Sequence, residues 1–241
     1  MKIYFLGTNG WYTTPTGNTP CILIDSQEGY VIFDAGNGLY KIDQYIKEDK
    51  PISLFISHFH LDHVSGLHTL SKFNFTQPIK IYLAKGRKKD FETLFNAPYT
   101  STDVNIEVHE LEEGKNEVGF SVEIFRMHHN HEDHGFRVTL EGKVIAYSGD
   151  TGICDNSKLL AQNAEMLIHE CSYPQVIDNW GHVDPILAAT LAKEANVKKL
   201  ILTHFDAAKY TSLEKRKWAE DEARKIFPNT QAADDTLISE L

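Results

Sequence analysis

The segment Ser57-His58-Phe59-His60-Leu61-Asp62-His63 constrains this chain more than any other feature. It directly follows the apolar run Ile52–Ile56, which is typical of a buried strand, and Asp62 lies where a helix is expected to begin. Three imidazoles and a carboxylate within six residues are poor core material, because charging them together is costly. A metal ion accepts neutral imidazole and ionised carboxylate as ligands. The motif therefore predicts a metal-binding loop, and the alternative is a polar turn in which Asp62 caps a helix.

Within such a loop, His58 and His60 can point to one side while Asp62 and His63 serve a second ion. Four residues cannot complete two metal sites, so further ligands are needed. We expect them at the ends of other apolar strands. The candidates are Asp150 after Val144–Ser148, His204 after Leu200–Thr203, and one histidine of the segment Met127-His128-His129-Asn130-His131-Glu132-Asp133-His134.

Apolar β-rich runs alternate with helical patterns along the chain, which predicts an α/β fold with mixed sheets buried between helices. Without internal repeats or low-complexity linkers, residues 1–241 are expected to form a single domain. The pair of runs on either side of Glu141-Gly142-Lys143 is typical of a hairpin. The expected strands are Ile3–Leu6, Cys21–Ile24, Tyr30–Phe33, Ile52–Ile56, Ile79–Leu83, Val118–Phe125, Phe136–Leu140, Val144–Ser148, Met166–His169 and Leu200–Thr203, and the expected helices are Leu39–Lys47, Asp62–Lys72, Lys85–Phe95, Asp184–Ala195 and Ser212–Phe227.

Composition narrows the class of protein. Hydrophobic residues make up 41% and charged residues 24% of the 241 residues, which excludes a disordered chain. No apolar run approaches the roughly 20 residues of a membrane span. The three cysteines are widely spaced and odd in number, which favours a reduced compartment and a cytoplasmic location.

The net charge of −10 disfavours general binding to nucleic acids, because proteins that depend on phosphate contacts usually carry a basic surface. Two short basic clusters are exceptions to the negative net charge, one around Arg87 and one at Lys215-Arg216-Lys217. We expect them to be solvated helix faces, although local charge can steer one phosphate group into a cleft.

Motifs spread over nearly the whole chain resemble those of the metallo-β-lactamase superfamily, and most closely its ribonuclease Z-like branch. The resemblance implies a four-layer αββα sandwich with the metal ions in the cleft between the sheet edges. The motifs that carry it are Phe5-Leu6-Gly7-Thr8, Phe33-Asp34-Ala35-Gly36, the His58–His63 loop, Ser148-Gly149-Asp150-Thr151, His169-Glu170, Gly181-His182 and Leu202-Thr203-His204-Phe205.

By this resemblance the site holds two Zn²⁺ ions, and manganese or iron could occupy the same positions. In this branch the histidine of the third motif precedes a Gly-aromatic-Arg sequence by five intervening residues. His129 has that spacing to Gly135-Phe136-Arg137, whereas His128 misses it by one residue and remains the alternative. The implied ligands are His58, His60 and His129 for the first zinc, Asp62, His63 and His204 for the second, and Asp150 as the bridge between them.

Two such ions share a hydroxide near neutral pH and neutralise negative charge on a phosphoryl or acyl centre. Asp62 could orient this hydroxide or take its proton. Glu170 and His182 resemble the pair that protonates the leaving alkoxide in ribonuclease Z, with the carboxylate holding the imidazole. The alternative for His182 is a capping or surface histidine. The loop aromatics Trp11, Tyr12, Tyr173 and Trp180 could stack on a substrate ring or close their loops onto the core.

The chain also departs from ribonuclease Z in three ways that make full-length tRNA a doubtful substrate. Only 21 positions separate His129 from Asp150, which leaves no room for the arm that grips tRNA. The segment Thr14-Pro15-Thr16-Gly17-Asn18 is uncharged where that family carries Lys and Arg. Asp184 adds a negative charge after the Gly181-His182 motif.

The sequence therefore predicts a dinuclear metal-dependent hydrolase, favoured as a phosphodiesterase that uses a metal-bridging hydroxide. The expected substrate is a small or exposed phosphodiester: a cyclic nucleotide, a cyclic phosphosugar or an RNA end. One alternative is a carboxylic ester, lactone or thioester hydrolase on the same metal core. Another is a catalytically idle, metal-stabilised sensor or RNA-binding accessory. No membrane partner is expected, and a homodimer is expected only by analogy with the branch.

Overall fold

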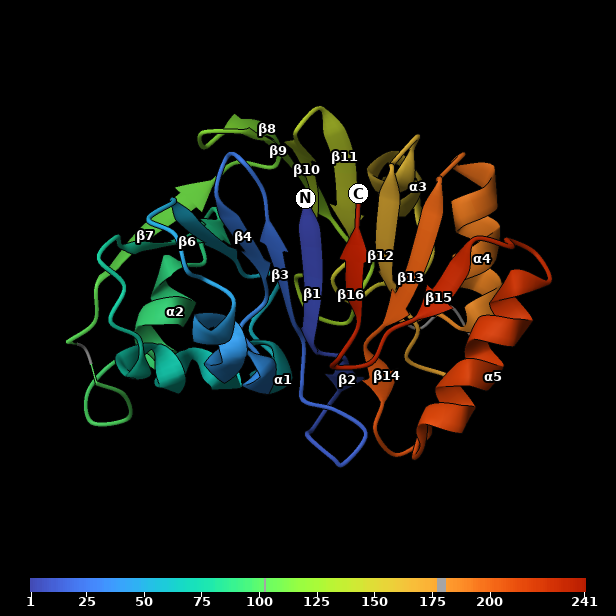
Figure 1. The fold of residues 1–241 in the computed structure, drawn as a ribbon, viewed down its shortest axis with the longest axis horizontal. Helices are drawn as coiled ribbons and strands as arrows, with labels where there is room; N and C mark the ends of the chain where they lie inside the picture. Colours follow the sequence, from blue (N-terminus) through green and yellow to red (C-terminus); the bar gives the residue numbers. More distant parts are fainter. Residues whose placement is uncertain (102, 177–180) are drawn as a thin grey trace.

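Two seven-stranded sheets lie face to face in the computed structural model, which describes residues 1–101, 103–176 and 181–241 (Figure 1). Both sheets mix parallel and antiparallel pairs, so the expected mixed α/β sandwich is confirmed. In spatial order, the first sheet contains β16 (Ile238–Glu240), β1 (Lys2–Gly7), β3 (Cys21–Asp25), β4 (Tyr30–Phe33), β5 (Ile52–Phe55), β6 (Ile79–Ala84) and β7 (Ile106–Leu111). The second contains β15 (Thr230–Ala232), β13 (Lys199–Thr203), β12 (Met166–Glu170), β11 (Lys143–Tyr147), β10 (His134–Leu140), β9 (Ser121–Arg126) and β8 (Gly114–Glu117).

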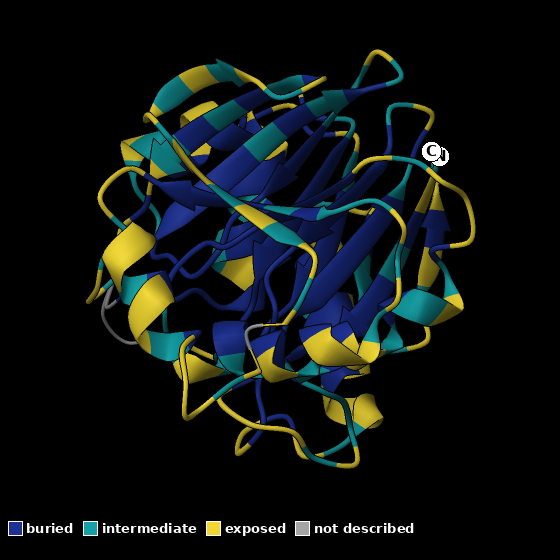
Figure 2. Cartoon of the chain, turned by 90° about the vertical axis from the view of Figure 1, so that its left-hand side faces the viewer, coloured by how far each residue is buried: buried dark blue, intermediate teal, exposed yellow. Residues whose placement is uncertain are grey.

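The space between the sheets is filled by aromatic and β-branched side chains. Phe33 stacks on Tyr147 across the two sheets with ring centroids 5.0 Å apart, and Phe55 meets Phe136 at 5.3 Å. Such ring pairs add to the stabilisation that burial itself provides. Figure 2 shows the sheets as the buried interior and the helices and loops as the exposed shell. Because the central strands β3, β4 and β5 are covered on both faces, they are nearly continuous apolar runs.

Helices cover the outer face of each sheet and complete the four layers (Figure 1). On the first sheet lie the 3₁₀ helix η1 (Asn37–Gln44), α1 (Leu61–Val64), the 3₁₀ helix η2 (Ser65–Lys72) and α2 (Lys88–Leu94). On the second lie α3 (Asp155–Ala161), α4 (Pro185–Glu194) and α5 (Leu213–Arg224). No helix in these described ranges is long and apolar enough to cross a membrane.

Two of the expected helices differ from the α-helices that the pattern predicts. The region Leu39–Lys47 is 3₁₀ helix only as far as Gln44, and Asp62–Lys72 is one turn of α-helix followed by 3₁₀ helix. Close backbone contact explains the second case. The Gly66 N–H donates to the Ala35 carbonyl at 2.8 Å, and a Cβ on Gly66 would lie 2.0 Å from the Gly36 oxygen. To keep this close backbone contact, the chain departs from a regular α-helix at Gly66.

The expected strand Val118–Phe125 is wrong at its start, because the chain turns there. Gly119 adopts φ +102°, and a tight hairpin joins β8 to β9. The predicted hairpin at Glu141-Gly142-Lys143 is confirmed as the β10–β11 pair. Helix α3 and the strands β7, β15 and β16 were not predicted from the sequence pattern.

The cluster Lys215–Lys217 is not uniformly solvated, which corrects the expectation from its charge. Arg216 is only 2% exposed, and its guanidinium lies 4.8 Å over the Phe205 ring. It donates to Thr8 Oγ1 at 2.7 Å and to the side-chain oxygen of Asn9. Arg216 therefore ties α5 to two loop segments that meet near the candidate site.

Those two segments form a short parallel ladder between β2 (Asn9–Gly10) and β14 (Phe205–Asp206). The ladder lies at the edge where the carboxyl ends of β5, β11, β12 and β13 meet (Figure 1). Ligands commonly bind at such strand ends in α/β sheets.

Candidate metal centre

The histidine-rich loop after β5 is shaped by a buried carboxylate. The Ser57 backbone N–H donates to Asp34 Oδ1 at 2.8 Å, so the loop turns away from the sheet immediately after the strand. Helix α1 begins at Leu61 with His60 as its N-cap residue. Asp62 is therefore not the cap, and its Oδ2 instead accepts a hydrogen bond from the Trp11 N–H at 2.7 Å.

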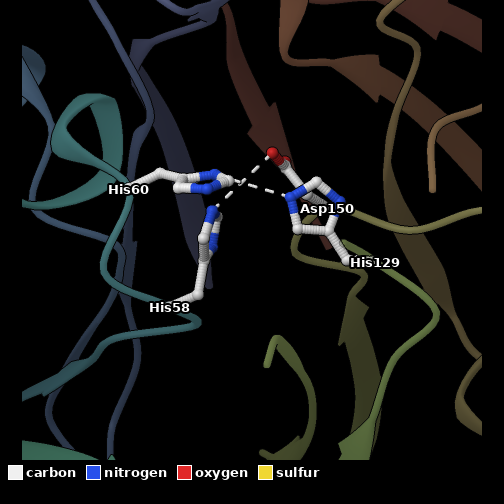
Figure 3. A group of neighbouring side chains, drawn as sticks. All are labelled: His58, His60, His129 and Asp150. Atoms are coloured by element: carbon white, nitrogen blue, oxygen red, sulfur yellow. Dashed lines mark hydrogen bonds and ion pairs between the residues drawn. The ribbon is translucent and has the colours of Figure 1, made fainter. Parts of the chain in front are cut away.

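Four expected ligands form one group in which the ligand atoms lie within 4.8 Å of one another (Figure 3). Nε2 of His129 lies 3.5 Å from Nδ1 of His60, and Nε2 of His58 lies 3.8 Å from Oδ2 of Asp150. His58 and His60 come from the loop after β5, whereas His129 and Asp150 come from the second sheet. The group consists of His58, His60, His129 and Asp150.

The remaining expected ligands, Asp62, His63 and His204, form a second group beside the first. Nε2 of His204 lies 3.0 Å from Nε2 of His63 and 3.3 Å from Oδ2 of Asp62. Asp150 reaches both groups, because its Oδ1 lies 3.3 Å from Nε2 of His204. A carboxylate in this position is suited to bridge two cations.

Buried acceptors fix how the histidines present their nitrogens. Asp133 Oδ2 accepts from Nδ1 of His58 at 2.6 Å, and Asp34 Oδ2 accepts from Nδ1 of His63 at 2.8 Å. Both rings therefore turn a bare Nε2 toward the site, as metal-bound histidines do. Sequence reasoning gave Asp34 and Asp133 no role, although both lie inside the motifs that it singled out.

The donor set fits two divalent cations. Within the described residues, Nε2 of His58 and Oδ1 of Asp150 are buried without a hydrogen-bond partner. Nε2 of His63 faces Nε2 of His204 at 3.0 Å, so these two atoms can share a proton or bind one cation. Nitrogen-rich sets with carboxylates suit zinc, iron or manganese.

At neutral pH the side chains of the first group are unprotonated, which favours metal binding. Burial, aided by the neighbouring His63, lowers the pKa of His58 to about 3, and burial beside His58 lowers that of His60 to about 4. Burial raises the pKa of Asp150, but the adjacent His204 and His63 outweigh it and hold that pKa well below its usual value. His63 differs: burial lowers its pKa, yet the Asp150, Asp34 and Asp62 carboxylates raise it overall. A metal at His63 would therefore displace a proton.

Four other histidines, His68, His109, His128 and His169, lie outside both groups. His128 is exposed and its backbone N–H bonds Thr151 Oγ1, so the geometry favours His129 for the third motif. His68 and His109 are exposed, and the buried His169 bonds the Glu170 carbonyl through Nδ1.

Glu170 and His182 form a buried pair at the end of β12. Glu170 Oε1 lies 3.0 Å from Nδ1 of His182, and its Oε2 accepts from Ser172 Oγ at 2.7 Å. Burial lowers the pKa of His182, but the Glu170 charge and hydrogen bond outweigh it and raise this pKa to about 9. Ser172 Oγ also lies 3.0 Å from Nδ1 of His204, which links this pair to the second metal group. No sequence pattern pointed to Ser172.

His182 is neither a surface residue nor a helix cap, because it is buried and Asp184 caps α4. The Asp184 carboxylate accepts from the backbone N–H groups of Leu187 at 2.9 Å and Val176 at 3.0 Å. Its charge therefore stabilises the start of a helix. Of the loop aromatics, Trp11 and Tyr173 border His182, Tyr12 is exposed, and Trp180 lies outside the described residues.

A cavity of about 650 Å³ opens beside the first group. Arg87 and Arg126 also line it, and Arg87 is paired with Asp90 and Glu132. The cavity is large enough for a small organic ligand whose reacting atom sits against the histidines. Its other lining residues are Phe59, Asp90, Met127, Asn130, His131 and Glu132.

Comparison with known proteins agrees with this geometry. Residues 30–205 match the family model of the beta-lactamase superfamily domain. Ribonuclease Z of Archaeoglobus fulgidus is 27% identical over 305 aligned positions, covering 100% of this chain and 98% of that protein. The human short-form tRNase Z structure superposes with a TM-score of 0.78 at 26% identity, covering 100% of this chain and 99% of that one. The metallo-beta-lactamase fold protein YhfI of Bacillus subtilis superposes with a TM-score of 0.82 at 21% identity and covers 99% of each chain.

The family model spans most of the chain, and its match includes the His58–His63 loop, Asp150 and His204. The fold, the paired His and Asp groups and the relatives all agree on one class of protein. The chain therefore belongs to the beta-lactamase superfamily, and it is a ribonuclease Z-like, metal-dependent hydrolase.

Proposed function

We propose that this chain is a dinuclear metal-dependent phosphodiesterase that acts on a small or exposed phosphodiester. The observation that carries the proposal is the Glu170–His182 pair beside the metal groups. Ligand atoms of Asp150, His182 and His204 lie within 4.8 Å of one another, so His182 can reach an atom that is bound at the metals. Alkoxide leaving groups of phosphodiesters need a proton, and a buried imidazole held by a carboxylate supplies one.

Two bound cations would activate water and neutralise the charge that builds on the phosphoryl group. The chain's own residues do the rest. Asp62, held by the Trp11 N–H, is placed to orient the nucleophile or take its proton. Asp34 and Asp133 keep His63 and His58 in the metal-binding tautomer. His182 holds a proton for the leaving oxygen. We propose zinc as the resident metal, with manganese or iron as the alternatives.

The segments that this chain lacks and the cavity beside the site favour a small substrate. The alignment with the A. fulgidus ribonuclease Z has 305 positions against 241 residues here, so the relative carries segments that this chain lacks. The relatives' names denote action on RNA, which supports an RNA end among the candidate substrates. The cavity beside the first group accommodates a cyclic nucleotide or phosphosugar, and Arg126 on its wall favours an anion. We therefore disfavour full-length tRNA. A cytoplasmic location and a homodimer stay predictions.

A turnover ratio tests the choice of substrate. Metal-loaded protein is assayed with bis(p-nitrophenyl) phosphate, with a γ-lactone and with a thioester. The proposal expects the diester to be hydrolysed with kcat/KM at least tenfold above those of the lactone and the thioester. A ratio that favours the lactone or thioester would assign the metal core to the carboxylic ester, lactone or thioester alternative.

A further inference from the structure

One aromatic side chain borders the site at His182 and His204. The Trp11 ring centroid lies 5.1 Å from that of His182, 5.4 Å from that of His204 and 5.9 Å from that of Tyr173. Trp11 nevertheless remains 41% exposed, so the indole offers surface to solvent beside the site. The cavity lined by His58, His60 and His129 contains neither Trp11 nor His182 in its wall. The site therefore has two chemically different flanks.

The loop holds Trp11 in place by several independent contacts. Trp11 has φ +64°, an unusual conformation for a bulky residue, and such outliers persist where surrounding structure enforces them. The adjacent β2–β14 ladder anchors the loop on one side. The side chain of Asn9 donates to the Tyr12 carbonyl at 3.2 Å and to Thr14 Oγ1 at 2.9 Å on the other. The backbone that carries the ring is therefore held in place before a ligand arrives.

The position of His182 identifies which part of a substrate would contact the Trp11 ring. In the proposed function, His182 protonates the leaving oxygen, so the leaving group lies next to His182. Trp11 and Tyr173 are the aromatic neighbours of that imidazole, at 5.1 Å and 5.5 Å. The retained group then lies toward the cavity with Arg87 and Arg126.

We infer that Trp11, backed by Tyr173, is a stacking platform that selects phosphodiesters whose leaving alcohol carries a planar aromatic ring, such as a nucleobase. This inference rests on the proposed function, because the leaving-group side is defined by His182. A fixed indole face binds any planar ring without reading its hydrogen-bonding groups. Trp11 is thus a specificity-determining residue that touches the substrate but takes no part in proton transfer.

Binding of two matched diester analogues tests the inference. Bis(2-phenylethyl)phosphinate and bis(2-cyclohexylethyl)phosphinate are hydrolysis-resistant diester analogues of the same charge and similar size, yet only the first has planar rings. Calorimetric titration of the zinc-loaded protein should give a Kd roughly tenfold lower for the phenyl compound. In Trp11→Leu this preference should fall to about one, whereas Trp11→Phe should keep most of it. Trp218→Leu is the matched control, because Trp218 is similarly exposed (45%) on α5.

Equal affinity of the wild-type protein for the two analogues would overturn the inference, as would failure to bind either one. So would a Trp11→Leu variant that loses the same factor for both, because that pattern indicates general structural damage. The zinc content of each variant is measured, since the Trp11 N–H contacts Asp62. Trp11→Gly provides a second deletion that accommodates the positive φ. The binding ratio is independent of turnover, so failure of the proposed function (no diester hydrolysis) is a separate result.

Discussion

At the scale of single residues, Glu170 sets the charge state of His182. Because Glu170 raises the pKa of His182 to about 9, the imidazole keeps its proton through neutral pH. A proton donor loses activity as the pH rises through its pKa. In Glu170→Gln the His182 pKa falls, so the alkaline limb of kcat/KM for an alkyl diester should move to lower pH. The rate at pH 8 should drop roughly 10- to 100-fold.

The matched control for this variant uses a different leaving group. p-Nitrophenolate leaves with little help from an acid, so Glu170→Gln should affect bis(p-nitrophenyl) phosphate far less than dibenzyl phosphate. Equal losses for the two diesters, with an unmoved alkaline limb, would contradict the assignment of His182 as the proton donor.

Asp34 acts through the residues that it holds. Its carboxylate accepts from Ser57 Oγ at 2.9 Å, from Tyr147 Oη at 2.6 Å and from His63 Nδ1 at 2.8 Å. Asp34→Asn replaces one acceptor oxygen with a donor, so the His63 tautomer is no longer enforced. Zinc affinity of the second group should fall about 10- to 100-fold in a chelator competition. Asp155→Asn, on the exposed first turn of α3, should leave it unchanged, and an unchanged affinity in Asp34→Asn would contradict this role.

At the scale of elements, the buried Arg216 links α5 to the loops that carry the site. Arg216→Met keeps much of the packing on Phe205 but leaves Thr8 and Asn9 without their donor. Losing hydrogen bonds to a buried charged group should lower the free energy of unfolding by about 3 kcal/mol in urea titration. The exposed neighbour Lys215→Met is the control and should change it by less than about 0.5 kcal/mol. A stable Arg216→Met protein would show that the guanidinium is dispensable.

Some of the helices and strands were predictable from the sequence, and others were not. Strands such as Tyr30–Phe33 and Met166–His169 were predictable, because buried strands are continuous apolar runs. The 3₁₀ helix that follows α1 was not, since it depends on the approach of Gly66 to the backbone at Gly36, which is a tertiary contact. The burial of Arg216 within a basic run was not predictable either, because it also depends on tertiary contacts. Strand β16, which pairs with β1 across the chain ends, has only three residues and little apolar pattern.

At the scale of the whole molecule, the candidate site joins the two sheets. His58, His60, Asp62 and His63 follow β5 of the first sheet, whereas His129, Asp150 and His204 follow strands of the second. The positions of Asp150 and His204 after apolar strands made them candidates for the same site, because strand ends gather at one edge, and the resemblance to the superfamily singled out His129. The orientation of each ring was not predictable, since it depends on Asp34, Asp133 and Ser172.

Metal removal should therefore loosen the whole sandwich. Metals bound a thousandfold above their dissociation constant stabilise a fold by about 4 kcal/mol, and for a chain of this size that corresponds to about 10 °C in Tm. We expect chelation to lower the Tm by that amount and added zinc to restore it. Asp150→Ala should show a much smaller response. If chelation removes the metal but leaves the Tm unchanged, the metals do not cross-link the two sheets.

The most direct test of the central claim is a zinc titration of metal-free protein that follows bound metal and turnover of bis(p-nitrophenyl) phosphate together. The account predicts that turnover rises to its maximum at two equivalents of zinc and disappears in Asp62→Ala. Two bound metals with no turnover of any diester, or turnover that survives in Asp62→Ala, would contradict a dinuclear phosphodiesterase. The first of these results would instead favour a carboxylic ester, lactone or thioester hydrolase, or an idle metal-stabilised module.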